Sequence, residues 1–266
     1  MQFGAIHRWK RTEESTKLIF LHGFLGSGMD FEIIADHFPN HPNLIAPDFP
    51  DYTRPPVTNF SWDSCLETLD AWVQSETENT PCVLVGYSMG GRIALQYALE
   101  NAQSLAGLVL VGATPGISDP VTRQERVQHD LALGKGLEEK TMQQFLEFWS
   151  HQEVIQSQRN IPEPYLSRMY DRRIASNQTA LSQALISLGT GTMTPAWQKL
   201  PQLQLPTLLV TGEQDKKFTD LARKMVQKLP KAKHTSIPES GHACCFEKPD
   251  AFVQILTSFL SSIRDA

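Results

Sequence analysis

A serine flanked by glycines stands at Gly86-Tyr87-Ser88-Met89-Gly90. It directly follows the apolar run 82–85 and leads into a stretch, 88–102, that begins at the serine and whose apolar residues recur at spacings of three and four. A Gly-x-Ser-x-Gly between a strand and a helix forces a sharp turn that raises the serine hydroxyl above the edge of a sheet. The same pentapeptide elsewhere is an ordinary turn, so its position is what predicts a reactive Ser88.

A serine hydroxyl is a weak nucleophile or base until an imidazole takes its proton and a carboxylate orients that imidazole. Asp215 follows the apolar run 207–212, and His242 follows a weaker run at 234–237. Each alone is equally a helix cap or a loop histidine. Their order after Ser88, and their positions after expected strands, predict a Ser88, Asp215, His242 triad with Glu213 as the reserve acid.

A developing negative charge on oxygen needs two backbone N–H donors. The residue after the serine, Met89, supplies one, and Phe24 in the loop His22-Gly23-Phe24 is expected to supply the other. His22 precedes the glycine and is expected to brace this loop.

Several continuous apolar runs end at turn signals, which is typical of strands buried on both faces of a parallel sheet. They span 18–23, 44–48, 82–86, 107–112 and 207–212, with a weaker one at 234–237. Amphipathic stretches between them predict an α/β-hydrolase fold with a mostly parallel, doubly wound sheet. We expect one domain over 1–266, with a polar helical cap insertion at about 118–197.

The amino-acid composition argues against several classes of function. The chain has 266 residues, 41% hydrophobic and 20% charged, and no run approaches the roughly 20 apolar residues that span a bilayer. Its net charge of −5 and lack of a basic run argue against nucleic acid and anionic membranes. The four cysteines lack metal-ligand spacing and are expected to be free thiols. We expect a cytoplasmic monomer or weak homo-oligomer with no metal.

The sequence resembles the 2-succinyl-6-hydroxy-2,4-cyclohexadiene-1-carboxylate synthase family, α/β-hydrolase-fold lyases of menaquinone and phylloquinone biosynthesis. Motifs spread over the chain carry the resemblance: His22-Gly23-Phe24, Gly86 to Arg92, Pro115-Gly116 with Arg123, Phe148-Trp149, Leu188-Gly189-Thr190-Gly191 with Trp197, Gly212 to Phe218, and Gly241-His242. The resemblance implies removal of pyruvate from 2-succinyl-5-enolpyruvyl-6-hydroxy-3-cyclohexene-1-carboxylate, a small polycarboxylate. It also implies that the Ser88 array acts as a base at carbon, without a cofactor.

Arginines distinguish this chain from a general esterase. Arg92 lies near a helix N-terminus, where a cation is disfavoured, so a nearby anion would explain it. Arg123 and Arg173 align with carboxylate-binding arginines of the family, with Arg126, Arg168 and Arg172 as neighbouring alternatives. Trp149 matches an aromatic residue of the family's insertion and is expected to pack on the substrate ring, and Tyr87, beside Ser88, is expected to contribute to the pocket, although aromatic residues are also common in cores.

Two other functions fit parts of this pattern. A hydrolase of esters, thioesters or carbon–carbon bonds would use the same triad and oxyanion hole, but would gain little from several cations at its mouth. A noncatalytic ligand receptor would not need the triad that this chain keeps.

Overall fold

A single mixed sheet forms the centre of the computed structural model, which describes residues 3–9, 16–38, 43–56 and 60–264. Its strand order is β1-β3-β2-β4-β5-β6-β7. The strands are β1 (Ile6–Trp9), β2 (Leu18–Leu21), β3 (Leu44–Pro47), β4 (Cys82–Tyr87), β5 (Leu105–Val111), β6 (Thr207–Gly212) and β7 (Ala232–Ile237). All six expected strands are present and parallel, which confirms the predicted fold class.

The edge strand β1 was not predicted from the sequence. It pairs antiparallel with β3 and is only partly buried. An edge strand does not need apolar side chains on both faces, so its sequence, IHRW, lacks the continuous apolar run that marks the inner strands.

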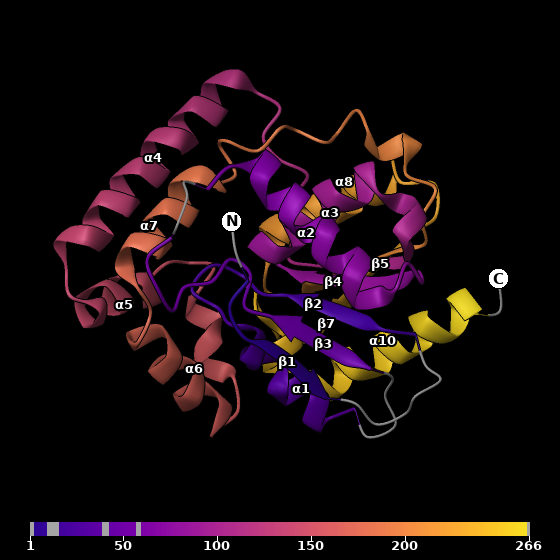
Figure 1. Ribbon diagram of the computed structural model, residues 1–266, viewed down its shortest axis with the longest axis horizontal. Coiled ribbons are helices and arrows are strands. Elements are labelled where there is room, and N and C mark those ends of the chain that lie inside the picture. The colour runs from indigo at the N-terminus through magenta and orange to yellow at the C-terminus, as the bar shows by residue number, and fades with distance from the viewer. Residues whose placement is uncertain (1–2, 10–15, 39–42, 57–59, 265–266) are drawn as a thin grey trace.

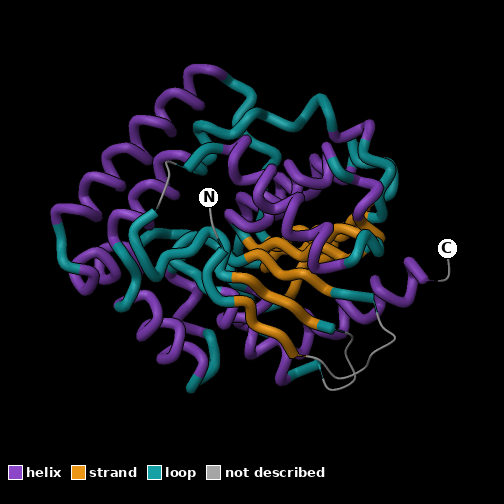
Figure 2. Tube along the Cα trace, in the orientation of Figure 1, coloured by secondary structure: helices purple, strands orange, loops and turns teal. Residues whose placement is uncertain are grey.

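Helices cover both faces of the sheet (Figure 2). Ile19 and Leu21 pack in one core layer, shared with α2 (Trp62–Thr77), α3 (Met89–Glu100) and α8 (Lys216–Val226). Leu18 and Phe20 face the other layer, shared with α1 (Glu32–Asp36), α9 (Cys244–Glu247) and α10 (Pro249–Arg264). Alternate residues of one strand therefore enter opposite cores, as the doubly wound prediction requires. In the described ranges, no helix combines the length and apolar character needed to cross a bilayer.

Of the described elements between β5 and β6, four α-helices and the first of two short 3₁₀ helices gather beyond one end of the sheet (Figure 1). They are α4 (Pro120–Glu139), α5 (Met142–Ser150), η3 (Gln156–Asn160), α6 (Tyr165–Ile174) and α7 (Gln178–Ser187), and we call them the helical insertion. The two ends of this segment are bonded to each other. Ala196 N donates to Pro115 O at 2.7 Å, and Trp197 Nε1 donates to Gly116 O at 2.9 Å.

Candidate active site

Ser88 stands between β4 and α3 with φ 53° and ψ −109°. This backbone conformation is unfavourable for a residue with a side chain, and such conformations concentrate at functional sites. Both flanking glycines are required by the turn, because a Cβ at Gly86 would overlap Gly90 O and one at Gly90 would overlap Leu21 O. The sequence thus folds into the sharp turn that its glycines predict.

The structure brings Ser88, His242 and Asp215 together in one hydrogen-bonded array. His242 Nδ1 lies 2.7 Å from Asp215 Oδ2, and His242 Nε2 lies 3.0 Å from Ser88 Oγ. An ionised carboxylate only accepts hydrogen bonds, so Nδ1 carries the proton and Nε2 is free to accept one from the serine. This arrangement can remove a proton from the hydroxyl, or through it from a substrate.

The reserve acid, Glu213, lies elsewhere. It is exposed, and its Oε2 accepts a hydrogen bond from Glu239 N at 3.1 Å. Asp215 is buried and faces the imidazole directly, so the geometry favours Asp215 as the acid of the array.

The space around the imidazole depends on Gly112. Its φ is +56°, and an added Cβ would lie 2.8 Å from His242 Cε1. The Phe218 ring packs near the imidazole, with centroids 4.4 Å apart. Gly112 and Phe218 therefore restrict where the ring can sit.

The two expected oxyanion donors lie on segments that border the serine. Met89 is the first residue of α3, so its amide has no acceptor within the helix. Phe24 follows Gly23, where an added Cβ would lie 3.5 Å from Ser88 Cβ. His22 Nδ1 donates to Gly23 O at 2.8 Å, and His22 Nε2 accepts from Phe49 N at 2.9 Å. His22 thus braces the loop, as predicted from its position.

Arg92 is 9% exposed and donates from NH1 to Leu188 O at 2.6 Å. The pKa of this guanidinium is lowered to about 10, chiefly by burial and also by the positive charge of Arg126, while Asp130 acts in the opposite direction. Arg126 itself donates to Asp130 Oδ1 at 2.8 Å. The charges of Arg92 and Arg126 thus oppose one another, and the one carboxylate that acts on Arg92, Asp130, is bonded to Arg126, so an additional anion here would be electrostatically favoured.

The Gly189-Thr190-Gly191 run packs against this cluster. An added Cβ at Gly189 would overlap Asp130 Oδ2, and one at Gly191 would lie 2.7 Å from Val127 N. Arg123 lies on the same helix, α4, and is partly exposed. The positive charge that lowers the pKa of Arg92 is that of Arg126, the alternative to Arg123 named above.

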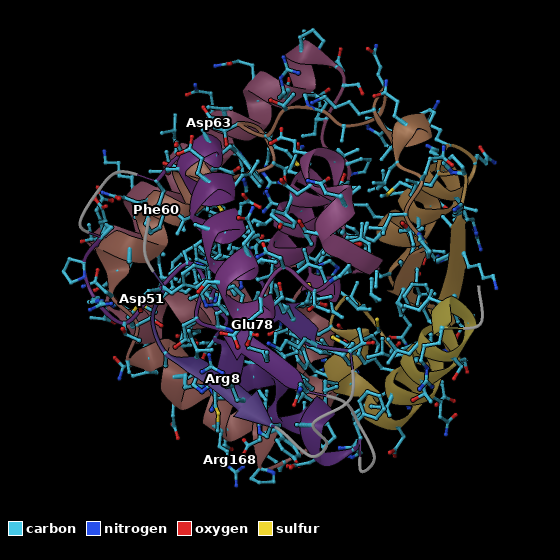
Figure 3. All side chains as sticks on the ribbon, turned by 45° about the vertical axis from the view of Figure 1, so that its right-hand side comes forward. Arg8, Asp51, Phe60, Asp63, Glu78 and Arg168 are labelled. Carbon is cyan, nitrogen blue, oxygen red and sulfur yellow. The ribbon has the colours of Figure 1, made fainter. Side chains whose placement is uncertain are left out.

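The three arginines of α6 differ in their hydrogen-bond partners. Arg168 NH1 lies 2.9 Å from Glu32 Oε1, and Arg172 NH2 lies 2.8 Å from Asp30 Oδ1, so both tie the insertion to the core. Figure 3 places Arg168 at the periphery of the molecule. Arg173 instead lines a cavity of about 970 Å³, and its buried Nε has no hydrogen-bond partner. Of the three, Arg173 is the one available to an anion.

Trp149 lines the same cavity and packs edge-on against Phe24, with ring centroids 5.3 Å apart. Gln158 connects the cavity to the serine turn, because its Nε2 lies 3.5 Å from the hydroxyl of Tyr87. Burial raises the pKa of Tyr87 well above its ordinary value, so its phenol is neutral at physiological pH. The cavity therefore lies against the segments that hold Ser88.

The chain is similar to known proteins over most of its length. The model of the α/β hydrolase fold family matches residues 17–249. The 2-succinyl-6-hydroxy-2,4-cyclohexadiene-1-carboxylate synthase of Serratia proteamaculans (strain 568) is 30% identical over 245 residues, covering 91% of this chain and 92% of the relative. The chain belongs to this synthase family. The solved structure of MenH from S. aureus is 28% identical, with a TM-score of 0.91 over 97% of this chain and 98% of that one.

Other similar structures carry less information about chemistry. An esterase from Exiguobacterium antarcticum has a TM-score of 0.78 over 96% of this chain and 94% of its own, but only 20% identity. That likeness shows the fold alone. Membership of the synthase family rests on the closer relatives.

In this synthase-family chain, sequence reasoning missed the contact of Gln158 with Tyr87, because nothing distinguishes one polar residue of a polar helical segment from another. It treated Arg126 only as an alternative, although the spacing Arg126-x-x-x-Asp130 places a cation and a carboxylate on one helix face. In the described ranges, no three His, Cys, Asp or Glu side chains form a group suited to a metal ion.

Proposed function

We propose that this chain eliminates pyruvate from 2-succinyl-5-enolpyruvyl-6-hydroxy-3-cyclohexene-1-carboxylate to form 2-succinyl-6-hydroxy-2,4-cyclohexadiene-1-carboxylate. The observation that carries the proposal is the hydrogen-bonded array of Ser88, His242 and Asp215, with the buried Arg92 one turn along α3 from Ser88 and the unpartnered Nε of Arg173 in the cavity. The proposed substrate is a small polycarboxylate, and the cytoplasm is the proposed location of the reaction.

In the proposed mechanism, the array acts as a base at carbon. His242 Nε2 accepts the proton of Ser88, and Ser88 Oγ takes a proton from a ring carbon of the substrate. The electron pair left behind forms a ring double bond as the bond between the ring and the enolpyruvyl oxygen breaks. The leaving group departs as the enolate of pyruvate and becomes pyruvate when its methylene carbon gains a proton, which balances the proton taken up by the array. No water is consumed, and no acyl-enzyme is needed.

The amides of Phe24 and Met89 are proposed to stabilise negative charge that develops on a substrate oxygen during proton removal. Donors fixed in the folded backbone need no reorganisation at the moment of reaction, which is why they lower the barrier more than water does. No metal or organic cofactor has a step in this mechanism.

Arg92, Arg123 or its neighbour Arg126, and Arg173 are proposed to bind the substrate carboxylates. Guanidinium groups bind carboxylates through two parallel hydrogen bonds, so they both attract and orient the substrate. Trp149 is proposed to pack on the ring, and Tyr87 to border it beside Ser88. The helical insertion then acts as a cap over the serine, within a single domain.

A hydrolase of esters, thioesters or carbon–carbon bonds remains the second candidate, because the same array and oxyanion donors serve acyl transfer. The desolvated Arg92 argues against it. A buried cation is costly without an anionic partner, and an apolar acyl group would supply none.

Reaction in ¹⁸O-labelled water tests the proposal. Elimination should give a ring product whose mass equals that of the substrate minus pyruvate, with no ¹⁸O retained in the ring. A ring product heavier than this by the elements of water would show hydrolysis, whichever product carries the ¹⁸O, and would contradict the lyase proposal. Ser88→Ala serves as the control for spontaneous loss of pyruvate.

A further inference from the structure

A second buried carboxylate lies beside the array. Glu247, the last residue of α9, is 4% exposed. Its Oε2 accepts a hydrogen bond from Gly241 N at 2.8 Å, and its Oε1 accepts one from Ala243 N at 3.0 Å. These amides belong to the residues immediately before and after His242, so one carboxylate holds the backbone on both sides of the histidine.

The helical insertion supplies a third donor. Ser157 Oγ, in η3, lies 2.7 Å from Glu247 Oε1. The approach is close because residue 241 is glycine: an added Cβ there would overlap the Ser157 side chain. The insertion thus contributes directly to the hydrogen bonding of the carboxylate that holds the histidine loop.

The three donors to Glu247 are all uncharged, and within the described part of the chain Glu247 forms no ion pair. A buried carboxylate of this kind depends on its hydrogen bonds, because removing one leaves a charged oxygen poorly solvated. On the other side of the loop, Ser240 O accepts from Gln214 N at 2.9 Å, which fixes the chain before Gly241. The hydrogen bonds of Glu247 fix the chain from Gly241 to Ala243.

We infer that Glu247 is a positioning residue that sets the distance from His242 Nε2 to Ser88 Oγ. Because Ser157 donates a hydrogen bond to Glu247, this distance also depends on the position of η3. Glu247 contacts neither Ser88 nor the imidazole nitrogens and transfers no proton. Its effect on pyruvate release rests on the proposed function, whereas its effect on the reactivity of Ser88 does not.

The test compares Ser157→Ala and Glu247→Gln with a matched control, Ser258→Ala, which removes an exposed serine bond to Gln254 O on α10. Two rates are measured: covalent labelling of Ser88 by a small alkyl fluorophosphonate, and pyruvate release. The fluorophosphonate needs the array but not the substrate pocket.

We expect Ser157→Ala to lower the labelling rate and kcat together by about tenfold, the effect of one lost hydrogen bond to a charged group. KM should stay within about twofold and the unfolding temperature should match that of the control, because substrate contacts and the core are unchanged. Glu247→Gln has one acceptor oxygen for three donors, so its losses should be larger.

Ser157→Ala with the same labelling rate and kcat as Ser258→Ala would overturn the inference. A loss of activity accompanied by an equal drop in thermal stability and a raised KM would also overturn it, because that result describes a structural role. Should Glu247→Gln fail to fold, Ser157→Ala alone decides. Should the wild type be labelled but release no pyruvate, the proposed function fails, and the ratio of labelling rates still decides the positioning role.

Discussion

The two carboxylate oxygens of Asp215 have different partners: Oδ2 accepts from His242 Nδ1 at 2.7 Å, whereas Oδ1 accepts from Phe218 N at 3.2 Å. The same side chain therefore orients the imidazole and caps helix α8. This double role allows the chemical and the structural contributions of Asp215 to be separated by substitution.

Asp215→Asn should keep the cap, because asparagine also accepts a hydrogen bond from a helix amide. It should disturb the imidazole tautomer, since its amide nitrogen can face Nδ1 as a donor. We expect kcat/KM for pyruvate release to fall by about 10³-fold or more, with the unfolding temperature changed by only about 2 °C. Glu213→Gln, on the exposed neighbouring acid, is the control and should retain activity. Loss below tenfold for Asp215→Asn would contradict the assigned role.

Arg92→Met tests whether the buried cation contributes to ligand binding rather than to the stability of the fold. Burial lowers the pKa of Arg92, so its charge is disfavoured in the folded protein without ligand. Replacing it by an apolar residue should leave the free energy of unfolding unchanged or raise it by about 1 kcal/mol. Activity should nevertheless fall by about 100-fold, because a charge-assisted contact is lost. Urea unfolding and steady-state kinetics measure both, and a destabilised variant with normal kcat/KM would refute the assignment.

Arg173→Gln and Arg168→Gln form a matched pair on α6. Arg173 lines the cavity without a partner at Nε, whereas Arg168 is bonded to Glu32. KM for the polycarboxylate should rise about tenfold or more in the first variant. It should change by less than about twofold in the second, because an exposed ion pair contributes little. Equal effects of the two substitutions would remove the reason for assigning Arg173 to the substrate.

Gly112→Ala places a methyl group where the imidazole now lies. The added Cβ would be 2.8 Å from His242 Cε1, at a residue whose φ is +56°. We expect a folded protein whose imidazole is displaced from Ser88, with kcat reduced by about 100-fold, because small displacements of catalytic groups have large effects on rate. Kinetics together with circular dichroism provide the test. An active Gly112→Ala enzyme would show that the histidine is less restricted than its contacts indicate.

Asp48 should make the stability depend on pH. Burial raises the pKa of its carboxyl, but hydrogen bonds from His7, Ser27 and Gly28 and the nearby His22 outweigh burial and lower it from 3.8 to about 2. Since the folded pKa lies below the unfolded one, the stabilisation is full above about pH 4 and is lost as the pH falls toward 2. Asp48→Asn should therefore be less stable than wild type by about 2 kcal/mol at neutral pH, with a difference that shrinks below pH 4. Urea unfolding at pH 7 and pH 3 checks the sign, and a difference that grows on acidification would be inconsistent with it.

The sequence predicted most of the elements that position the candidate site. Inner strands buried on both faces must be continuously apolar, and the turn around Ser88 tolerates only glycine at Gly86 and Gly90. The strands and the turn can therefore be recognised from the sequence. The edge strand β1 cannot be recognised in this way, because it is only partly buried and has no continuous apolar run. Which of Arg168, Arg172 and Arg173 is free to bind an anion could not be predicted either, since the acids that pair with the first two lie more than 130 positions away in the sequence.

The contacts of Glu247 illustrate the same limit. A glutamate five residues after a histidine has no special meaning in the sequence, and its importance comes from two backbone amides and Ser157, which lies 90 positions away. Long-range hydrogen bonds of one side chain to backbone amides depend on how the elements pack rather than on local pattern.

The most direct test of the account is the rate of pyruvate release from freshly prepared 2-succinyl-5-enolpyruvyl-6-hydroxy-3-cyclohexene-1-carboxylate by wild type and by Ser88→Ala, with p-nitrophenyl acetate as a control substrate. We predict rapid release by wild type, a loss of at least about 10³-fold in Ser88→Ala, and little ester cleavage by either. Negligible pyruvate release by folded wild-type protein that cleaves the ester efficiently would contradict it and leave a hydrolase on the same triad.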